Sequence, residues 1–354
     1  MSEQNTKVAE PRVLAPAGHS TPQANSLKKF MGGSAGRSMG LVIALALLFV
    51  VGAATGGDRF LSVDNVLTVL RLASITGVVA IGVTFIITAG GIDLSVGSVL
   101  GLTTVIASLA SIQLAATQSS WLLIVVVALA VGAAVGLING LVIAYGNVVA
   151  FIATLATLVA ARGFAELVSG RRTQIVTNRE FLGFMRSEAL GIPILIWIFI
   201  LVAAAGWFLL NRTTFGRRTI AIGGNLEASR LAGIKVKRHL VYLYVLSGLG
   251  AGIAGVMMLG RTTAGTSTHG YLMELDVIAA VVVGGTLLAG GRGTIMGTVL
   301  GVLIFSTLTN VFTQNNLDTS VQSLAKGLII VVAVLLQQRF AARGPRRRKA
   351  GSSR

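Results

Sequence analysis

Ten apolar stretches, most of them long enough to cross a lipid bilayer, limit what this chain can fold into. They lie at 39–55, 72–89, 92–111, 121–144, 150–168, 191–210, 240–260, 276–290, 294–313 and 319–336. A hydrocarbon core of ~30 Å needs about 20 apolar residues in a helix, and the first and eighth stretches are short by that measure. The chain is also 54% hydrophobic and only 12% charged, whereas soluble domains carry roughly 25% charged residues.

Lipid cannot satisfy the polar groups of the backbone, so only helices and closed barrels span membranes. The apolar stretches are continuous rather than alternating, which excludes a transmembrane barrel. The sequence therefore predicts an all-α integral membrane protein with about ten transmembrane helices.

The basic residues predict the orientation. Most of the 29 Lys and Arg residues lie before the first stretch, between 211 and 239, or after the last stretch. An even number of spans puts these three segments on one side, which the positive-inside rule makes cytoplasmic. We therefore expect both termini in the cytoplasm, and we attribute the net charge of +17 to this bias rather than to a nucleic-acid partner. The loop 169–190 is the exception, because its four arginines fall on the outer side.

These patterns predict three parts: a disordered basic cytoplasmic tail at 1–38, a transmembrane domain at 39–338 with a cytoplasmic loop at 211–239, and a basic cytoplasmic tail at 339–354. The chain has no cysteine, and its three histidines are scattered. We therefore expect no metal site. The sequence also lacks a Gly-x-x-x-x-Gly-Lys-[Ser/Thr] loop and any recognisable catalytic set. We expect no enzyme activity and no cofactor, with any energy source on another chain.

Glycines recur in two patterns. Residues 89–101 match residues 289–301 at an Ala-Gly-Gly triplet, at one further glycine and at a Val-Leu-Gly triplet. This match indicates either an internal repeat, which many transporters contain, or glycine bias. Glycines four apart, such as Gly132, Gly136 and Gly140, are typical of helices packed closely in membranes, within one subunit or between two.

The run Ala-Gly-Gly-Ile-Asp-Leu-Ser-Val-Gly at 89–97 lies between two apolar segments. We interpret it as a tight glycine turn with Asp93 and Ser95 at the start of the second helix. This run resembles the signature of the ribose- and xylose-type sugar permeases of bacterial ABC importers. Two further runs are similar to the same family: Gly-Leu-Ile-Asn-Gly at 136–140, and Phe-Ile-Ala-Thr-Leu at 151–155, which is followed by Arg162-Gly163. The family commonly has a double proline before the second of these runs, where this chain has Val-Val-Ala at 148–150.

The loop 211–239 contains signals for a short helix. Asn225 can cap a helix at 226–232, with Glu227 in its first turn and Gly233 as its stop. Taken alone, such a helix either docks a soluble partner or lies on anionic lipid headgroups. The loop is similar to the coupling loop of the same permeases, which implies contact with an ATPase through Gly223, Gly224, Asn225, Glu227, Ala232 and Gly233.

The resemblance implies a multi-pass permease subunit in a bacterial inner membrane, importing a sugar or sugar-like polyol. Its implied partners are an ABC ATPase subunit, a periplasmic sugar-binding protein, a second permease subunit, identical or paralogous, and membrane lipid. The alternatives are a branched-chain amino-acid ABC permease and an ion-coupled secondary sugar carrier. The sequence does not identify the sugar.

Polar residues within the apolar stretches are candidates for function, because ionisable groups in a bilayer are costly. Asp93 either caps a helix together with Ser95 or lines a gate, where it could pair with Lys326. Arg162 and Glu166 are four apart, which favours an ion pair along one helix. The candidates for the substrate pathway or gate are Asp93, Ser95, Asn139, Thr154 and Asn310.

Overall fold

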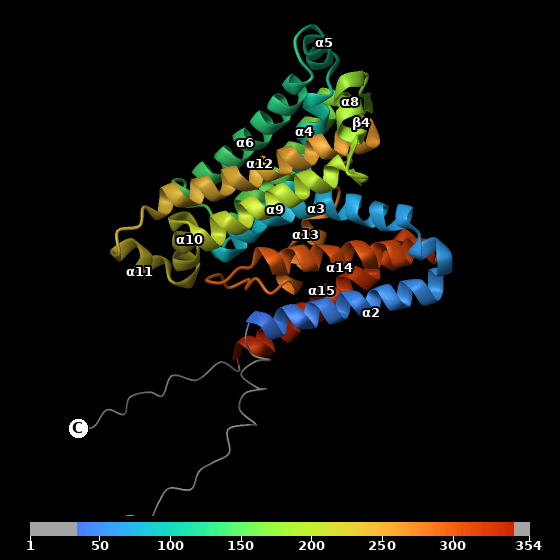
Figure 1. Ribbon diagram of the computed structural model, residues 1–354. Helices are drawn as coiled ribbons and strands as arrows, with labels where there is room; N and C mark the ends of the chain where they lie inside the picture. Colours follow the sequence, from blue (N-terminus) through green and yellow to red (C-terminus); the bar gives the residue numbers. More distant parts are fainter. Residues whose placement is uncertain (1–33, 343–354) are drawn as a thin grey trace, which may run out of the picture. The chain divides into compact units, whose positions relative to one another are not determined.

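The computed structural model describes residues 34–342, and this part of the chain is almost entirely helical (Figure 1). It divides into a unit at 1–37, of which only the first turn of α2 is described, and a unit that starts at Ser38. The helices are α2 (Ser34–Leu61), α3 (Val63–Thr88), α4 (Val96–Ala107), α5 (Ala110–Gln118), α6 (Leu122–Ala144), α7 (Ala150–Ser169), α8 (Arg179–Arg186), α9 (Ile194–Arg212), α10 (Thr214–Gly224), α11 (Leu226–Leu231), α12 (Val236–Thr262), α13 (Met273–Val283), α14 (Ile295–Gln314) and α15 (Thr319–Ala342). Two antiparallel pairs of very short strands join β1 (Gln174–Ile175) to β4 (Ala264–Gly265) and β2 (Glu188–Ala189) to β3 (Ile192–Pro193).

Seven helices in the described part of the chain are long and apolar enough to cross a membrane, namely α2 from Met39 onward, α3, α6, α7, α9, α12 and α14. An eighth crossing is added if α4 and α5, which meet at a bend of 58°, form one span. The fold is thus an all-helical membrane protein with seven to eight candidate spans, and ten spans are not confirmed.

The difference comes from the predicted spans at 276–290 and 319–336. The first falls on α13, which has 11 residues and is therefore about 16 Å long at ~1.5 Å per residue. Gly285 ends α13 with a φ of +91°, and the Thr286 N–H bonds back to Val281 O at 3.2 Å. This is a glycine stop that apolar content alone does not reveal. The second falls on α15, which is not one of the seven helices.

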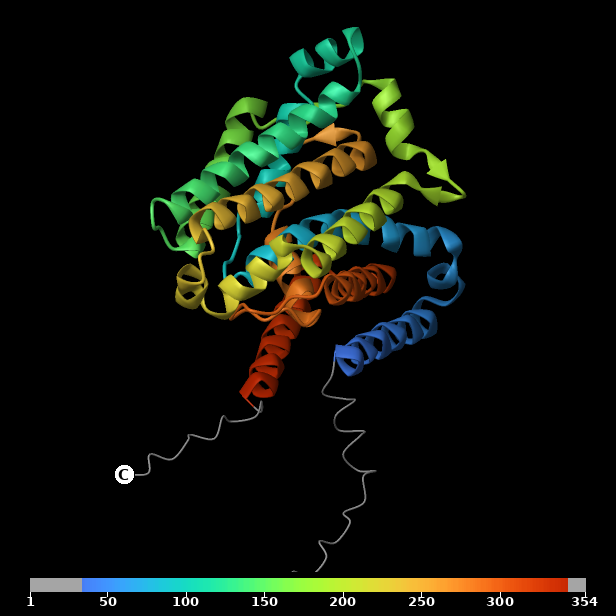
Figure 2. The ribbon, with the colours of Figure 1, turned by 60° about the vertical axis from the view of Figure 1, so that its left-hand side comes forward.

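Helices α3 and α12 are the most buried of the candidate spans, and α6 lies along α12 in both ribbon views (Figures 1 and 2). The close contact depends on glycine. A Cβ atom on Gly132 of α6 would collide with Gly248 O of α12, and a Cβ atom on Gly136 would collide with Tyr244 O. This stripe of glycines therefore packs helices within one subunit, which is the first of the two interpretations of these positions.

Two stretches of non-helical backbone interrupt the bundle: residues 89–95 between α3 and α4, and residues 284–294 between α13 and α14. These stretches contain the two glycine motifs that match in sequence, and the motifs are in contact. Gly291 N donates to Thr88 O at 2.8 Å, and a Cβ atom on Gly290 would lie 2.9 Å from Gly90 Cα. Irregular backbone at membrane depth is tolerated only where protein or water surrounds it.

The predicted tails lie largely at 1–33 and 343–354, outside the described residues. Residues 34–38 and 339–342 belong to α2 and α15. Both helices therefore extend a few residues beyond the predicted domain boundaries.

Candidate functional site

Asp93 lies in the non-helical stretch before α4 and is only 3% exposed. Its Oδ1 accepts hydrogen bonds from the Ser95 N–H at 2.9 Å and the Ser95 hydroxyl at 2.6 Å. Its Oδ2 accepts a bond from the Ser247 hydroxyl of α12 at 3.0 Å. The carboxylate therefore holds Ser95, the residue directly before α4, and it ties the start of α4 to α12. The Ser95 side chain makes no cap bond to α4, and the Asp93 side chain reaches only Ser95, so the predicted cap by Asp93 and Ser95 is not formed.

A chain of hydrogen bonds continues from Ser95 into two other helices. The Asn139 amide of α6 donates to the Ser95 hydroxyl oxygen at 2.9 Å, and Asn139 Oδ1 accepts from the Thr157 hydroxyl of α7 at 2.5 Å. In this series of hydrogen bonds, Thr157 donates to Asn139, Asn139 donates to Ser95, and Ser95 donates to the Asp93 carboxylate. Donors directed at a buried carboxylate stabilise its negative charge.

Thr154 lies one turn before Thr157 on α7. Its hydroxyl donates to Ala150 O at 2.9 Å and lies 3.3 Å from Ile92 O. Four of the predicted pathway residues, Asp93, Ser95, Asn139 and Thr154, thus gather around the stretch 91–95. Sequence reasoning missed Ser247 and Thr157. The one-turn spacing of Thr154 and Thr157 was a signal for the second, whereas Ser247 has none.

Asp93 forms no salt bridge among the residues that the structure describes. Lys326, the basic partner considered for it, instead binds Asp276 at 2.9 Å. The alternative in which Asp93 pairs with Lys326 is therefore wrong.

The fifth predicted pathway residue, Asn310, lies elsewhere. It forms a reciprocal amide pair with Asn65, in which each side chain donates to the other, at 2.8 and 3.1 Å. Gln314 adds a third bond to the same Asn65 oxygen at 3.1 Å. These contacts join α14 to the start of α3. The Asn310 amide is therefore used in packing these two helices.

Arg162 and Glu166 do not pair as predicted. Arg162 donates to Ser267 O and, at 2.8 Å, to His269 O, while Glu166 pairs with Arg171 at 3.2 Å. The loop after α12 passes over α7 and presents its carbonyl groups to Arg162. Arg162 therefore binds this loop instead of Glu166, its neighbour on the helix. Burial, with Arg261 and Arg162 nearby, lowers the pKa of His269 in this loop to about 4.

The short helix predicted in the loop 211–239 is present as α11. Asn225 Oδ1 accepts from the Ala228 N–H at 2.9 Å, which is the expected cap, and Gly233 adopts a φ of +81° after the helix. Ala232 is the C-cap of the helix, which ends at Leu231. Glu227 pairs with Arg230 along the helix at 3.3 Å.

Helix α11 leaves apolar side chains uncovered. Leu231 is 90% exposed and Leu226 is 43% exposed. Beside α11, a cavity of about 510 Å³ lies between α10 and the start of α12, and its basic lining residues are Arg218, Lys235 and Arg238.

Gly223 and Gly224 end α10 and differ in their surroundings. A Cβ atom on Gly223 would collide with Thr88 O and lie 2.5 Å from Gly291 N, so it would intrude on the hydrogen bond between them. A Cβ atom on Gly224 would meet nothing within 4 Å. Gly223 therefore packs against Thr88 at the end of α3 and against Gly291 of the second glycine motif, whereas Gly224 has open space where a side chain would start.

A second charged cavity, of about 290 Å³, lies at the other end of the long helices. Arg71 near the start of α3, Arg186 of α8 and Arg261 at the end of α12 line it. Glu188 compensates part of this charge by contacting Arg71 at 3.6 Å. Arg186 belongs to the loop 169–190, whose arginines are the exception to the predicted orientation.

No group of three or more His, Cys, Asp or Glu side chains that could hold a metal ion occurs in residues 34–342.

Comparisons with known proteins agree with one another. Residues 65–334 match the family model described as "Branched-chain amino acid transport system / permease component". A ribose import permease protein of Haemophilus influenzae is 42% identical over 298 residues, which are 83% of this chain and 90% of that protein. A ribose import permease protein of Bacillus subtilis is 40% identical over 87% of this chain and 93% of its own length. The xylose transport system permease protein of Escherichia coli is 32% identical, over 94% and 98%. No solved structure matches the chain.

Proposed function

We propose that this chain, which belongs to the permease components of carbohydrate ABC importers, carries a sugar or sugar-like polyol of the ribose, galactose or xylose type across the membrane. The observation that carries this proposal is the 42% identity to a ribose permease over nearly the whole transmembrane part. The relatives named above are sugar permeases, which favours a sugar over a branched-chain amino acid as the substrate. Such a permease is the transport component of the importer and works with an ATPase and a binding protein.

For the topology, we propose that both termini and α10–α11 face the cytoplasm. Ten crossings result if α4–α5, α15 and the combination of α13 with residues 284–294 each count as one crossing. The discontinuous crossings would then contain the two glycine motifs, which is where many transporters place their internal repeats. Alkaline phosphatase fused after residue 340, and active only outside the cytoplasm, should be inactive. An active fusion contradicts the orientation.

For the coupling to ATP hydrolysis, we propose that α11 docks into a groove of the ATPase. The exposed Leu226 and Leu231 give it an apolar contact, and the cap at Asn225 and the stop at Gly233 hold it as a helix. Movement of α11 would reach the bundle through Gly223, which touches Thr88 at the end of α3 and Gly291 of the second glycine motif. Only Gly224 of the glycine pair is then free to contact the ATPase.

For the binding protein, we propose docking at the outer cavity of Arg71, Arg186 and Arg261. Three guanidinium groups with one nearby carboxylate suit acidic side chains on a partner. This docking would also explain why arginines occur on the side of the membrane where the positive-inside rule disfavours them.

We further propose that a second permease subunit, identical or paralogous, completes the pathway, and that anionic lipid headgroups contact the basic cavity between α10 and α12.

The proposed function is tested in the native host by deleting the gene and growing the strain on single carbon sources. Growth and uptake should fail for one sugar or a few related sugars, and expression of this chain should restore them. Loss of leucine uptake with normal sugar uptake would favour the branched-chain amino-acid alternative and contradict the proposal.

A further inference from the structure

A small pocket with both apolar and polar lining residues lies among α3, α13, α14 and α15, and its volume is about 140 Å³. Its lining residues are Leu72, Thr76, Asp276, Phe305, Ser306, Thr309 and Lys326. Thr76 lies near the middle of α3, which is a candidate span from Val63 to Thr88. The pocket therefore lies inside the candidate span, about one to two turns of α3 deeper than Arg71 of the outer cavity.

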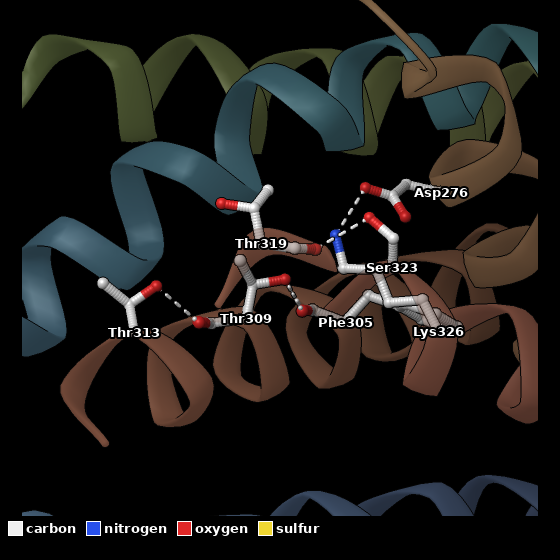
Figure 3. A network of polar contacts seen from close by, with 7 residues as sticks. All are labelled: Asp276, Phe305, Thr309, Thr313, Thr319, Ser323 and Lys326. Carbon is white, nitrogen blue, oxygen red and sulfur yellow. Dashed lines mark hydrogen bonds and ion pairs between the residues drawn. The ribbon is translucent and has the colours of Figure 1, made fainter. Parts of the chain in front are cut away.

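An ion pair forms one wall of the pocket. Lys326 Nζ of α15 lies 2.9 Å from Asp276 Oδ2 of α13, and Figure 3 shows the two side chains reaching toward each other between the helices. The side chains remain 19% and 34% exposed, respectively. Charged groups at this depth are costly, because each one must be paired or hydrated.

The partial exposure indicates what lies beside the pair. If lipid covered this face, the exposed part of two charges would lie in hydrocarbon, at a cost of several kcal/mol on insertion scales (~2.5–3.5 kcal/mol per charged residue). A fully buried structural pair would have no exposure at all. Lipid is therefore disfavoured on the face of α13 and α15 that carries the pair, and the face borders either water or a polar surface of a second subunit.

The remaining polar groups of the pocket suit hydroxyl groups of a ligand. Thr309 donates its proton to Phe305 O at 2.9 Å, which leaves its oxygen free to accept (Figure 3). Within residues 34–342, the Ser306 and Thr76 hydroxyls form no hydrogen bond. A carboxylate accepts, an ammonium group donates and hydroxyls do both. Because Asp276 and Lys326 neutralise each other, the set fits a neutral ligand with several hydroxyls.

We propose that this pocket, which we call the Asp276–Lys326 pocket, is a point in the translocation pathway where the sugar exchanges water for hydrogen bonds to the permease. The proposal rests on the proposed function and assigns residues to it. Asp276 and Lys326 lie 50 positions apart in the sequence, and no local sequence pattern indicates that they pair.

The first test uses the absence of cysteine from this chain. Thr309→Cys introduces a single thiol in the pocket, and Val126→Cys introduces one on α6, where the side chain is 58% exposed at a position expected to face lipid. Both variants are assembled with the ATPase and the binding protein in proteoliposomes and exposed to a charged, water-soluble methanethiosulfonate, with the label measured on this chain only.

Thr309→Cys should be labelled and Val126→Cys should not. The sugar that the unmodified importer transports, chosen from ribose, galactose and xylose, should reduce labelling of Thr309→Cys at least threefold, whereas leucine should not. Absence of labelling overturns the water-facing pocket, and labelling that the transported sugar does not reduce overturns the sugar contact. Failure of the proposed function is distinguishable, because the unmodified importer would then show no ATP-dependent uptake of any of the three sugars.

A second test separates a pathway role from a structural one. Asp276→Asn and Lys326→Met should each lower uptake at least tenfold while the chain still assembles with the ATPase and supports its hydrolysis of ATP. Glu166→Gln, which breaks the peripheral pair with Arg171, is the matched control and should leave uptake within twofold. The exchange Asp276→Lys with Lys326→Asp restores an ion pair but moves its charges, so uptake should stay low. Recovery of uptake in the exchanged protein would show that only the pairing matters and would contradict the proposal.

Discussion

Gly223 packs against Thr88 and Gly291, and this contact can be tested by comparing Gly223→Ala with Gly224→Ala. The two residues are adjacent at the end of α10, and each substitution adds one methyl group. On Gly223 that methyl group would lie 2.5 Å from Gly291 N and would collide with Thr88 O, whereas heavy atoms in favourable contact lie ~3.5–4.0 Å apart. On Gly224 it would meet nothing within 4 Å.

The magnitude follows from three terms. Overpacking a tight contact costs about 1–3 kcal/mol, and loss of the buried hydrogen bond from Gly291 N to Thr88 O costs about 1–3 kcal/mol. Replacing glycine by alanine within a helix returns roughly 0.5–1 kcal/mol. Gly223→Ala should therefore destabilise the junction by about 1–5 kcal/mol, whereas Gly224→Ala should be neutral or slightly stabilising.

Two measurements on each variant test this reasoning: thermal unfolding in detergent, and sugar uptake by the reconstituted importer. Gly223→Ala should unfold at a lower temperature and lose at least tenfold in uptake, and Gly224→Ala should match the unmodified protein in both. Equal behaviour of the two variants in both assays would refute the account of the junction.

Four further predictions concern other parts of the molecule. Asp93→Asn should retain most uptake, because the amide oxygen can still accept a hydrogen bond from Ser95. Asp93→Leu should lose uptake although the protein reaches normal levels in the membrane. Near-zero uptake in Asp93→Asn would show that the charge itself is required. Gly233→Asp should abolish uptake and stimulation of the ATPase without affecting membrane insertion, because the residue needs a φ of +81° and adjoins the docking helix; normal coupling would refute this role. Arg71→Glu combined with Arg261→Glu should weaken the binding protein's affinity at least tenfold and leave basal ATP hydrolysis unchanged, and an unchanged affinity would exclude docking at the outer cavity. Burial holds the pKa of His269 at about 4, below its unfolded value of ~6.5. The contribution of His269 to the free energy of unfolding should therefore be constant above pH ~6.5 and fall as the pH drops from ~6.5 toward about 4. Unfolding of His269→Gln, measured over the same pH range, should show a smaller fall, and an equal fall would contradict this role.

Local signals predicted local structure well. Asn225 as a cap and Gly233 as a stop identified α11 to within one residue, because both depend only on neighbouring backbone groups. Hydropathy located the long helices for the same reason. It missed the end of α13, since residues 281–291 remain apolar although a glycine pair ends the helix.

Contacts between residues that are distant in sequence could be predicted only where several candidate residues were assigned to the same site. Asp93, Ser95, Asn139 and Thr154 were each chosen as polar residues in apolar segments, and the fold gathers them around one stretch of backbone. Arg162 shows the opposite case: its helical neighbour was the expected partner, but carbonyl groups from a loop more than a hundred positions away bind it instead. Nothing local in the sequence encodes such a contact.

As a sugar permease, this chain should form the membrane pathway of an ATP-driven importer. The most direct measurement reconstitutes it in proteoliposomes with its ATPase and binding protein, and follows radiolabelled ribose, galactose, xylose and leucine with ATP on the ATPase side. The account predicts uptake of at least one of the sugars that requires ATP, the ATPase and the binding protein together, without leucine uptake. Sugar uptake that persists without ATP and is driven by an ion gradient, or uptake of leucine alone, would contradict it.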